Sequence, residues 1–230
     1  MLPTVDSLVE QVMASPRLPE IVDDLRTRLA AERVARRKFY EEIGDGEKWE
    51  FVNGQAIMHS PDTVRNMAIR SWVERLLGAY VDARGLGVVL SEKSLCVFPR
   101  NDFMPDVLFY ATGKAASLKP TQLKLPPPDL AVEVLSPSTA KRDRGVKFED
   151  YEAHGVGEYW IVDPDREIIE QYVQASGRFV PRLKSGKGIL TSAVVPGFRA
   201  PVRAFFDSTA NLSALKTLLA PRRPKQTDEG

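Results

Sequence analysis

The stretch "PDLAVEVLSPSTAKRDRGVKFEDYEAHGVGEYWIVDP", residues 128–164, decides the fold of this chain. It opens with an apolar run typical of a buried strand and closes with a second one. Between them lies a helical segment with Ser138 or Thr139 as its cap and Gly155 as its terminator. This order and length predict two parallel strands joined by a helical crossover. We therefore expect an α/β fold with a mixed sheet flanked by helices.

The chain divides into three regions, and this stretch lies in the second. Residues 1–46 are charged and rich in helix formers, which predicts an N-terminal helical arm. Residues 47–206 alternate strand and helix signals and form the predicted main domain. They start with a hairpin at Asn53-Gly54 and a helix that Ser60 and Pro61 are expected to begin. Residues 207–230 predict a short helix followed by a disordered tail.

Composition excludes several function classes. The 32 basic and 31 acidic residues give a net charge of +1, so nucleic-acid binding would depend on a local patch. One cysteine and two histidines are too few for a disulfide framework or a three-histidine zinc site. Both histidines are expected at the surface or at a helix end. No apolar run is long enough to span a membrane and no signal peptide is evident, so we expect a cytoplasmic protein.

Glu133 is the unusual residue of the first strand, because a charge among apolar neighbours needs a compensating partner. Asp106 follows a proline and opens another strand, so the two carboxylates converge if the strands are neighbours. Carboxylate oxygens suit a hard cation such as Mg²⁺ or Mn²⁺. The alternatives are a buried partner such as Lys147 for Glu133 and a simple turn role for Asp106.

The helix of the crossover supplies further candidates. Asp143, Lys147 and Tyr151 are spaced four residues apart and share one helix face, which could pack against Glu133. Without context, Asp143 and Lys147 are equally consistent with a solvated ion pair. The neighbouring Lys141, Arg142 and Arg144 are weaker candidates for contacts to nucleic-acid phosphates, with a solvated helix face as the alternative.

Four segments together resemble the Uma-two family of proposed restriction endonucleases, within the PD-(D/E)XK nuclease superfamily. They are "WEFVNGQAIMHSP" at 49–61, "PDVLFY" at 105–110, the 128–164 stretch and "VVPGFRAPVRAFF" at 194–206. The resemblance implies a restriction-endonuclease-like fold, with Asp106 and Glu133 as the two acidic motif residues. The motif lysine is replaced by Leu135, and Lys147 is the family's match for it. Glu50 matches a recurrent family glutamate, with a metal or support role or a hairpin salt bridge as alternatives.

The same resemblance implies a function. Asp106, Glu133 and the main-chain carbonyl of Val134 are expected to hold Mg²⁺ or Mn²⁺, and Lys147 to orient the attacking water or stabilise the transition state. The expected reaction is hydrolysis of DNA phosphodiester bonds, and a homodimer would cut both strands. The chain departs from the family where many members have a histidine, since it reads "DTVRNMAIR" at 62–70. The alternative is a catalytically inactive, nuclease-like module for nucleic-acid binding or protein assembly.

Overall fold

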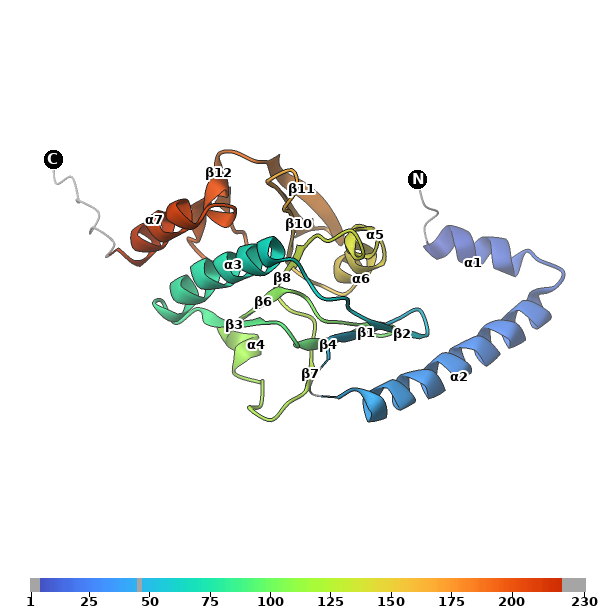
Figure 1. Ribbon diagram of the computed structural model, residues 1–230. Coiled ribbons are helices and arrows are strands. Elements are labelled where there is room, and N and C mark those ends of the chain that lie inside the picture. The colour runs from blue at the N-terminus through green and yellow to red at the C-terminus, as the bar shows by residue number, and fades with distance from the viewer. Residues whose placement is uncertain (1–4, 45–46, 221–230) are drawn as a thin grey trace.

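The computed structural model describes residues 5–44 and 47–220 of the chain (Figure 1). It combines helices with three sheets. The helices are α1 (Val5–Met13), α2 (Leu18–Glu42), α3 (Val64–Asp82), α4 (Thr112–Ala115), α5 (Ala140–Asp143), α6 (Val146–Ala153), α7 (Ser208–Leu219) and the 3₁₀ helix η1 (Val202–Phe205). None of the described helices is both long and apolar enough to cross a membrane.

The central sheet has the strand order β11-β10-β9-β8-β6-β3. Its strands are β3 (Gly87–Ser91), β6 (Val107–Ala111), β8 (Leu130–Val134), β9 (Glu158–Asp163), β10 (Ile168–Ala175) and β11 (Arg178–Ser185). Strands β8 and β9 are parallel, and α5 and α6 connect them, which confirms the predicted crossover. The other neighbouring pairs are antiparallel, so the predicted mixed α/β fold is confirmed.

The crossover differs from the prediction in one respect, since its single expected helix is two short ones. The interruption lies at Arg144 and Gly145, between α5 and α6. At Gly145 a side chain would meet the carbonyl oxygen of Lys141 at 2.9 Å, so the close backbone approach favours glycine here. The break leaves Asp143 and Lys147 within 3.2 Å of each other.

Strand β8 is buried on both faces, as its apolar sequence predicts. Val132 and Val134 belong to the core shared with α3 and α7, whereas Ala131 belongs to a second core that includes Tyr151 of α6. Because side chains alternate along a strand, Glu133 points to the same side as Ala131, toward α6. This alternation brings its carboxylate to the crossover helix.

The second sheet has the order β2-β1-β5-β4-β7 and carries the predicted hairpin. Its strands are β1 (Trp49–Val52), β2 (Gln55–Met58), β4 (Leu95–Val97), β5 (Asp102–Phe103) and β7 (Lys124–Leu125). Asn53 and Gly54 have φ values of 49° and 83°, as a two-residue turn requires. The hairpin brings Lys48, Glu50 and His59 to one end of β1 and β2, because His59 N donates to Lys48 O at 2.9 Å.

Helix α3 begins later than Ser60 and Pro61, so that prediction was wrong. Thr63 is the N-cap residue, and its hydroxyl accepts a hydrogen bond from Asn66 N at 3.1 Å. The hydroxyl at position 63 satisfies a free helical amide, and residues 60–62 therefore remain an irregular segment. They lie beside the cleft described below.

The N-terminal region is two helices, α1 and α2, which project from the two sheets (Figure 1). Helix α1 buries no residue and α2 buries only Phe39, within the described range. At this end of α2, Tyr40 donates to Asp102 at 2.8 Å and Arg36 forms an ion pair with the same carboxylate. An ion pair between Glu32 and Arg100 at 2.7 Å adds to these contacts, so the C-terminal half of α2 attaches the arm.

The C-terminal region packs on the α3 side of the central sheet. It contains β12 (Ile189–Thr191) paired with β13 (Arg199–Pro201), then η1 and α7, and α7 contacts α3. Helix α7 begins at Ser208, because Asp207 caps it by accepting a hydrogen bond from Ala210 N at 2.7 Å. The predicted disordered tail falls almost entirely on residues 221–230, outside the described part of the chain.

Candidate active site

Asp106 and Glu133 meet where β6 and β8 pair. The register places Val107 opposite Val132, so Asp106 precedes one strand at the point where Glu133 and Val134 end the other. Val134 N donates to Asp106 Oδ2 at 2.8 Å. The exposed fractions are only 4% for Asp106 and 3% for Glu133, yet both line a cleft of about 990 Å³. The structure therefore brings together the two carboxylates that the sequence singled out.

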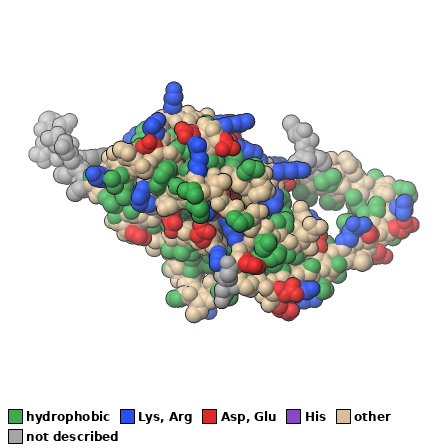
Figure 2. All heavy atoms as spheres, viewed as in Figure 1, with side chains coloured by type: hydrophobic (Ala, Val, Ile, Leu, Met, Phe, Trp, Pro, Cys, Tyr) green, Lys and Arg blue, Asp and Glu red, His purple; other side chains and the backbone are tan. Residues whose placement is uncertain are grey.

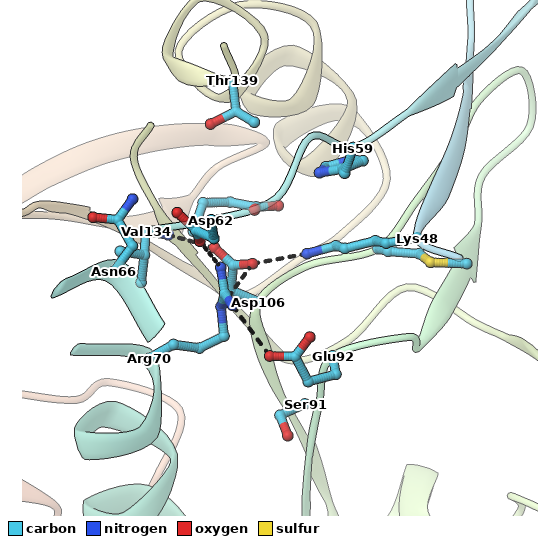
Figure 3. A network of polar contacts seen from close by, with 12 residues as sticks. Lys48, His59, Asp62, Asn66, Arg70, Ser91, Glu92, Asp106, Val134 and Thr139 are labelled. Carbon is cyan, nitrogen blue, oxygen red and sulfur yellow. Dashed lines mark hydrogen bonds and ion pairs between the residues drawn. The ribbon is translucent and has the colours of Figure 1, made fainter. Parts of the chain in front are cut away.

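The cleft has walls from several distant segments (Figure 3). One wall is formed by the ends of β1 and β2, a second by α3 and the segment before it, and a third by the turn at 135–139 after β8. Asn66 of α3 is buried and donates to the carbonyl oxygen of Leu135 at 3.0 Å, which fixes that turn.

Two basic side chains that no sequence motif had indicated surround Asp106. Lys48 Nζ lies 2.8 Å and Arg70 Nε 3.1 Å from Asp106 Oδ1 (Figure 3). Burial alone raises the pKa of this carboxyl, but Lys48, Arg70 and the amide of Val134 together hold its pKa below 3.8. Asp106 is therefore ionised at neutral pH. Only the tertiary fold joins Lys48, Arg70 and Asp106, which are far apart in the chain.

Glu133 lies in a different electrostatic environment. Its Oε1 accepts hydrogen bonds from Lys147 Nζ at 3.0 Å and from the Tyr151 hydroxyl at 2.9 Å. Burial is the main cause that raises the pKa of Glu133 to about 8, and the nearby carboxylates of Asp143, Asp106 and Glu50 add to it while Lys147 opposes it. Without a bound cation, this carboxyl holds its proton over most of the neutral range.

Lys147 is the centre of a buried group of charges. Its side chain has no solvent exposure, and Nζ lies 2.8 Å from Glu50, 3.0 Å from Glu133 and 3.2 Å from Asp143. Burial lowers the pKa of Lys147, but the three carboxylates outweigh it and raise the pKa well above 10.5. The ammonium stays charged behind Glu133, and it is not among the residues that line the cleft.

Glu50 supports this group and also faces His59 within its own hairpin. Its Oε1 contacts Lys147 and accepts from Met104 N at 3.0 Å, and its Oε2 lies 3.0 Å from His59 Nε2. Burial raises the pKa of Glu50, while Lys147 and His59 bring it down below 4.5. His59 was expected at the surface, but its side chain is only 12% exposed and lines the cleft. His154 does follow a helix, at the C-cap of α6.

The three basic candidates on the crossover do not form one patch. Arg142 turns inward, with Nε 3.9 Å from Glu50, and Arg144 pairs with Glu170 at 2.6 Å on β10. Of these three candidates, only Lys141 is exposed and makes no ion pair with the residues that the structure describes. The α5 segment therefore offers a single free cation at its surface.

The donor set of the cleft fits a hard cation. Every recorded contact of the Glu133 carboxylate is made by Oε1, which leaves Oε2 available within the described structure. Asp106 adds an ionised carboxylate beside it. Two carboxylates and several waters are the usual surroundings of protein-bound Mg²⁺. Across residues 5–44 and 47–220, no group of three or more His, Cys, Asp or Glu residues is arranged to hold a metal.

Comparison with solved structures identifies the class of fold. A crystal structure titled "putative nuclease belonging to DUF820 from Anabaena variabilis ATCC 29413" has a TM-score of 0.63 and 15% sequence identity, and the match covers 75% of this chain and 96% of that chain. At this identity the similarity shows the fold alone, a nuclease-like α/β fold. A search of curated proteins finds no match.

The family follows from the sequence match. Residues 36–203 match the model of the Uma2 family, which is described as "Putative restriction endonuclease". The match includes every residue of the cleft discussed above. This chain belongs to the Uma2 family, and the expected family is confirmed. Because the match starts inside α2, most of the projecting arm lies outside it.

Proposed function

We propose that this protein is a divalent-cation-dependent endonuclease that hydrolyses DNA phosphodiester bonds in the cleft between the two sheets and α3. The observation that carries the proposal is the meeting of Asp106 and Glu133 at the end of β8, both lining one cleft of about 990 Å³. The family and the fold support nuclease chemistry in general. The cation, the DNA substrate and the roles of the residues are our inference from the site.

Asp106, Glu133 and the main-chain carbonyl of Val134 are the groups that would hold Mg²⁺ or Mn²⁺. When bound, the cation would polarise the phosphate and lower the pKa of an attacking water. Asp106 is suited to this role because it is ionised and fixed by Val134 N. Glu133 must release its proton to become a second anionic ligand, so cleavage should become faster as the pH rises toward about 8.

Lys147 acts through Glu133 in this proposal. The sequence suggested direct contact with water or phosphate, but the Nζ atom is fully buried and bonded to Glu50, Glu133 and Asp143. We assign it as a positioning residue that fixes the Glu133 carboxylate toward the cleft. Tyr151 shares this task through its hydrogen bond to Glu133 Oε1, and Glu50 holds the lysine.

One observation favours the alternative of an inactive, nuclease-like binding module. Lys48 and Arg70 already neutralise Asp106, and Lys147 already compensates Glu133. Such compensation is sufficient for a stable fold without a cation. DNA binding with no cleavage in either Mg²⁺ or Mn²⁺ would support this alternative. Homodimerisation also remains a prediction.

The test is cleavage of supercoiled plasmid and single-stranded DNA in Mg²⁺ or Mn²⁺. Glu133→Gln and Asp106→Asn should each reduce the rate by about 100-fold or more, because each removes a charged group at the reacting centre. Glu149→Gln on the exposed face of α6 is the matched control and should cleave like the wild type. Activity that survives chelation, or that is unchanged in both site variants, contradicts the proposal.

A further inference from the structure

Lys48 and Arg70 both pair with Asp106, but they are held to different degrees. Arg70 also contacts Asp62 at 2.5 Å and Glu92 at 3.2 Å, so three carboxylates fix its guanidinium (Figure 3). Lys48 has Asp106 as its only recorded ion-pair partner within residues 5–44 and 47–220. Its side chain is 16% exposed and lines the cleft. Lys48 is thus the cation that can leave Asp106 without breaking another ion pair.

A divalent cation on Asp106 cannot coexist with this arrangement of Lys48. The ammonium lies 2.8 Å from Oδ1, which is the distance of a direct ion pair. A metal ligated by the same oxygen would stand next to the ammonium, and like charges at that range repel strongly. When the metal binds, one of the two basic side chains on Asp106 Oδ1, Lys48 or Arg70, must move. Arg70 is held from three sides, so the displaced group is Lys48.

The cleft supplies the place to which Lys48 can move. A lysine side chain carries a compact charge on a flexible stem, so it can reach a new anion without a change in the backbone. The backbone of Lys48 stays fixed by the hydrogen bond from His59 N to Lys48 O. A phosphate group beside a cation on Asp106 and Glu133 would lie in the cleft that Lys48 lines, and would accept the displaced ammonium.

We propose that Lys48 is an exchangeable cation of the site, paired with Asp106 before a divalent ion binds and contacting the DNA phosphate afterwards. Lys48 therefore competes with the metal for Asp106 and, once displaced, strengthens the binding of DNA. This inference rests on the proposed function, because it assumes that cation and phosphate share the cleft.

The first test measures Mn²⁺ binding in the absence of DNA, by the loss of the electron paramagnetic resonance signal of free Mn²⁺. Lys48→Met should bind Mn²⁺ at least about tenfold more tightly than the wild type, because the substitution removes a positive charge that contacts Asp106 and repels the ion. Lys48→Arg keeps the charge and should bind no more tightly than the wild type. Lys119→Met, an exposed lysine outside the cleft, is the matched control and should show no change.

The second test measures affinity for a short DNA duplex by fluorescence anisotropy, in EDTA and in Ca²⁺. In Ca²⁺, Lys48→Met should bind several-fold more weakly than the wild type, with a salt dependence smaller by about 0.9 in log–log slope. In EDTA the two proteins should bind equally, because the lysine is then occupied by Asp106. If Lys48 had the same role in both conditions, Lys48→Met would lower the affinity for DNA equally in EDTA and in Ca²⁺.

Two results overturn the proposal. One is an unchanged or weaker Mn²⁺ affinity in Lys48→Met with a folded circular dichroism spectrum, and an absence of Mn²⁺ binding in all variants counts as the same result. The other is an equal loss of DNA affinity with and without Ca²⁺. The Mn²⁺ titration needs neither DNA nor cleavage. Tighter Mn²⁺ binding in Lys48→Met without any DNA cleavage would therefore reject the nuclease proposal and leave the cation exchange supported.

Discussion

The two carboxylates of the site differ in their immediate charged neighbours. Around Asp106, two cations, Lys48 and Arg70, contact one carboxylate at the edge of the cleft. Around Lys147, three carboxylates contact one cation in the interior. The pKa of Asp106 is lowered, while that of Glu133 is raised to about 8. Two acidic residues that line one cleft thus have pKa values shifted in opposite directions.

The contrast teaches that burial alone does not set the state of a carboxylate. Glu158 on β9 is a third example, with no solvent exposure and no cation among its recorded contacts in the described chain. Its oxygens accept only from neutral donors, which are Trp160, Gln171, Ser192 and the amides of Ala193 and Val194. The three buried carboxylates therefore differ in the number and the charge of the groups that contact them.

The largest effect is expected where the acidic cluster loses its cation. Lys147→Met leaves Glu50, Glu133 and Asp143 buried without their common partner, which should lower the free energy of unfolding by about 3–5 kcal/mol. Urea denaturation followed by circular dichroism measures this loss. Lys141→Met removes an exposed lysine of α5 and should change stability by no more than about 0.5 kcal/mol. Similar stabilities for both variants would show that the buried cluster is dispensable.

A second effect distinguishes the two carboxylates by pH. The native protein keeps the Glu133 proton between about pH 4.5 and 8, whereas the unfolded chain loses it, so this group makes the free energy of unfolding fall as the pH rises through that range. Asp106 has the opposite sign, because its lowered pKa gives stability that is lost as the pH falls below 3.8.

Urea denaturation across this pH range, with Glu133→Gln and Asp106→Asn, separates the two contributions. The difference between the wild type and Glu133→Gln should change by at least about 1.4 kcal/mol between pH 4.5 and 8. The difference for Asp106→Asn should be flat there and change only at more acidic pH. Parallel curves for the two variants would contradict the assigned asymmetry.

The smallest effect concerns the one neutral donor to Glu133. Tyr151→Phe removes the hydroxyl that lies 2.9 Å from Oε1 and keeps the ring among its aromatic neighbours. The loss of one hydrogen bond should cost about 1 kcal/mol of stability. Tyr172→Phe removes a comparable hydroxyl that donates to Glu170 outside the site, so it serves as the control for cleavage rates. Only Tyr151→Phe should slow DNA cleavage, and equal rates would remove Tyr151 from the site.

The local elements of the fold were predictable from residue patterns. The turn at Asn53-Gly54 and the parallel strands around residues 128–164 were both indicated by short-range signals. The start of α3 was predicted too early because two residues, Ser60 and Thr63, each offer a capping hydroxyl. The break at Gly145 was missed because it depends on a backbone approach that a helix pattern does not reveal.

Residue patterns were enough to show which residues are chemically unusual: a glutamate in an apolar strand, an aspartate after a proline, and a lysine spaced to share a helix face. They were enough because periodicity and local composition are readable along the chain. The partners of these residues follow from the three-dimensional fold alone. Lys48 and Arg70 reach Asp106, and Glu50 reaches Lys147, through contacts between distant segments. Charge balance depends on distances in space, which no sequence spacing encodes.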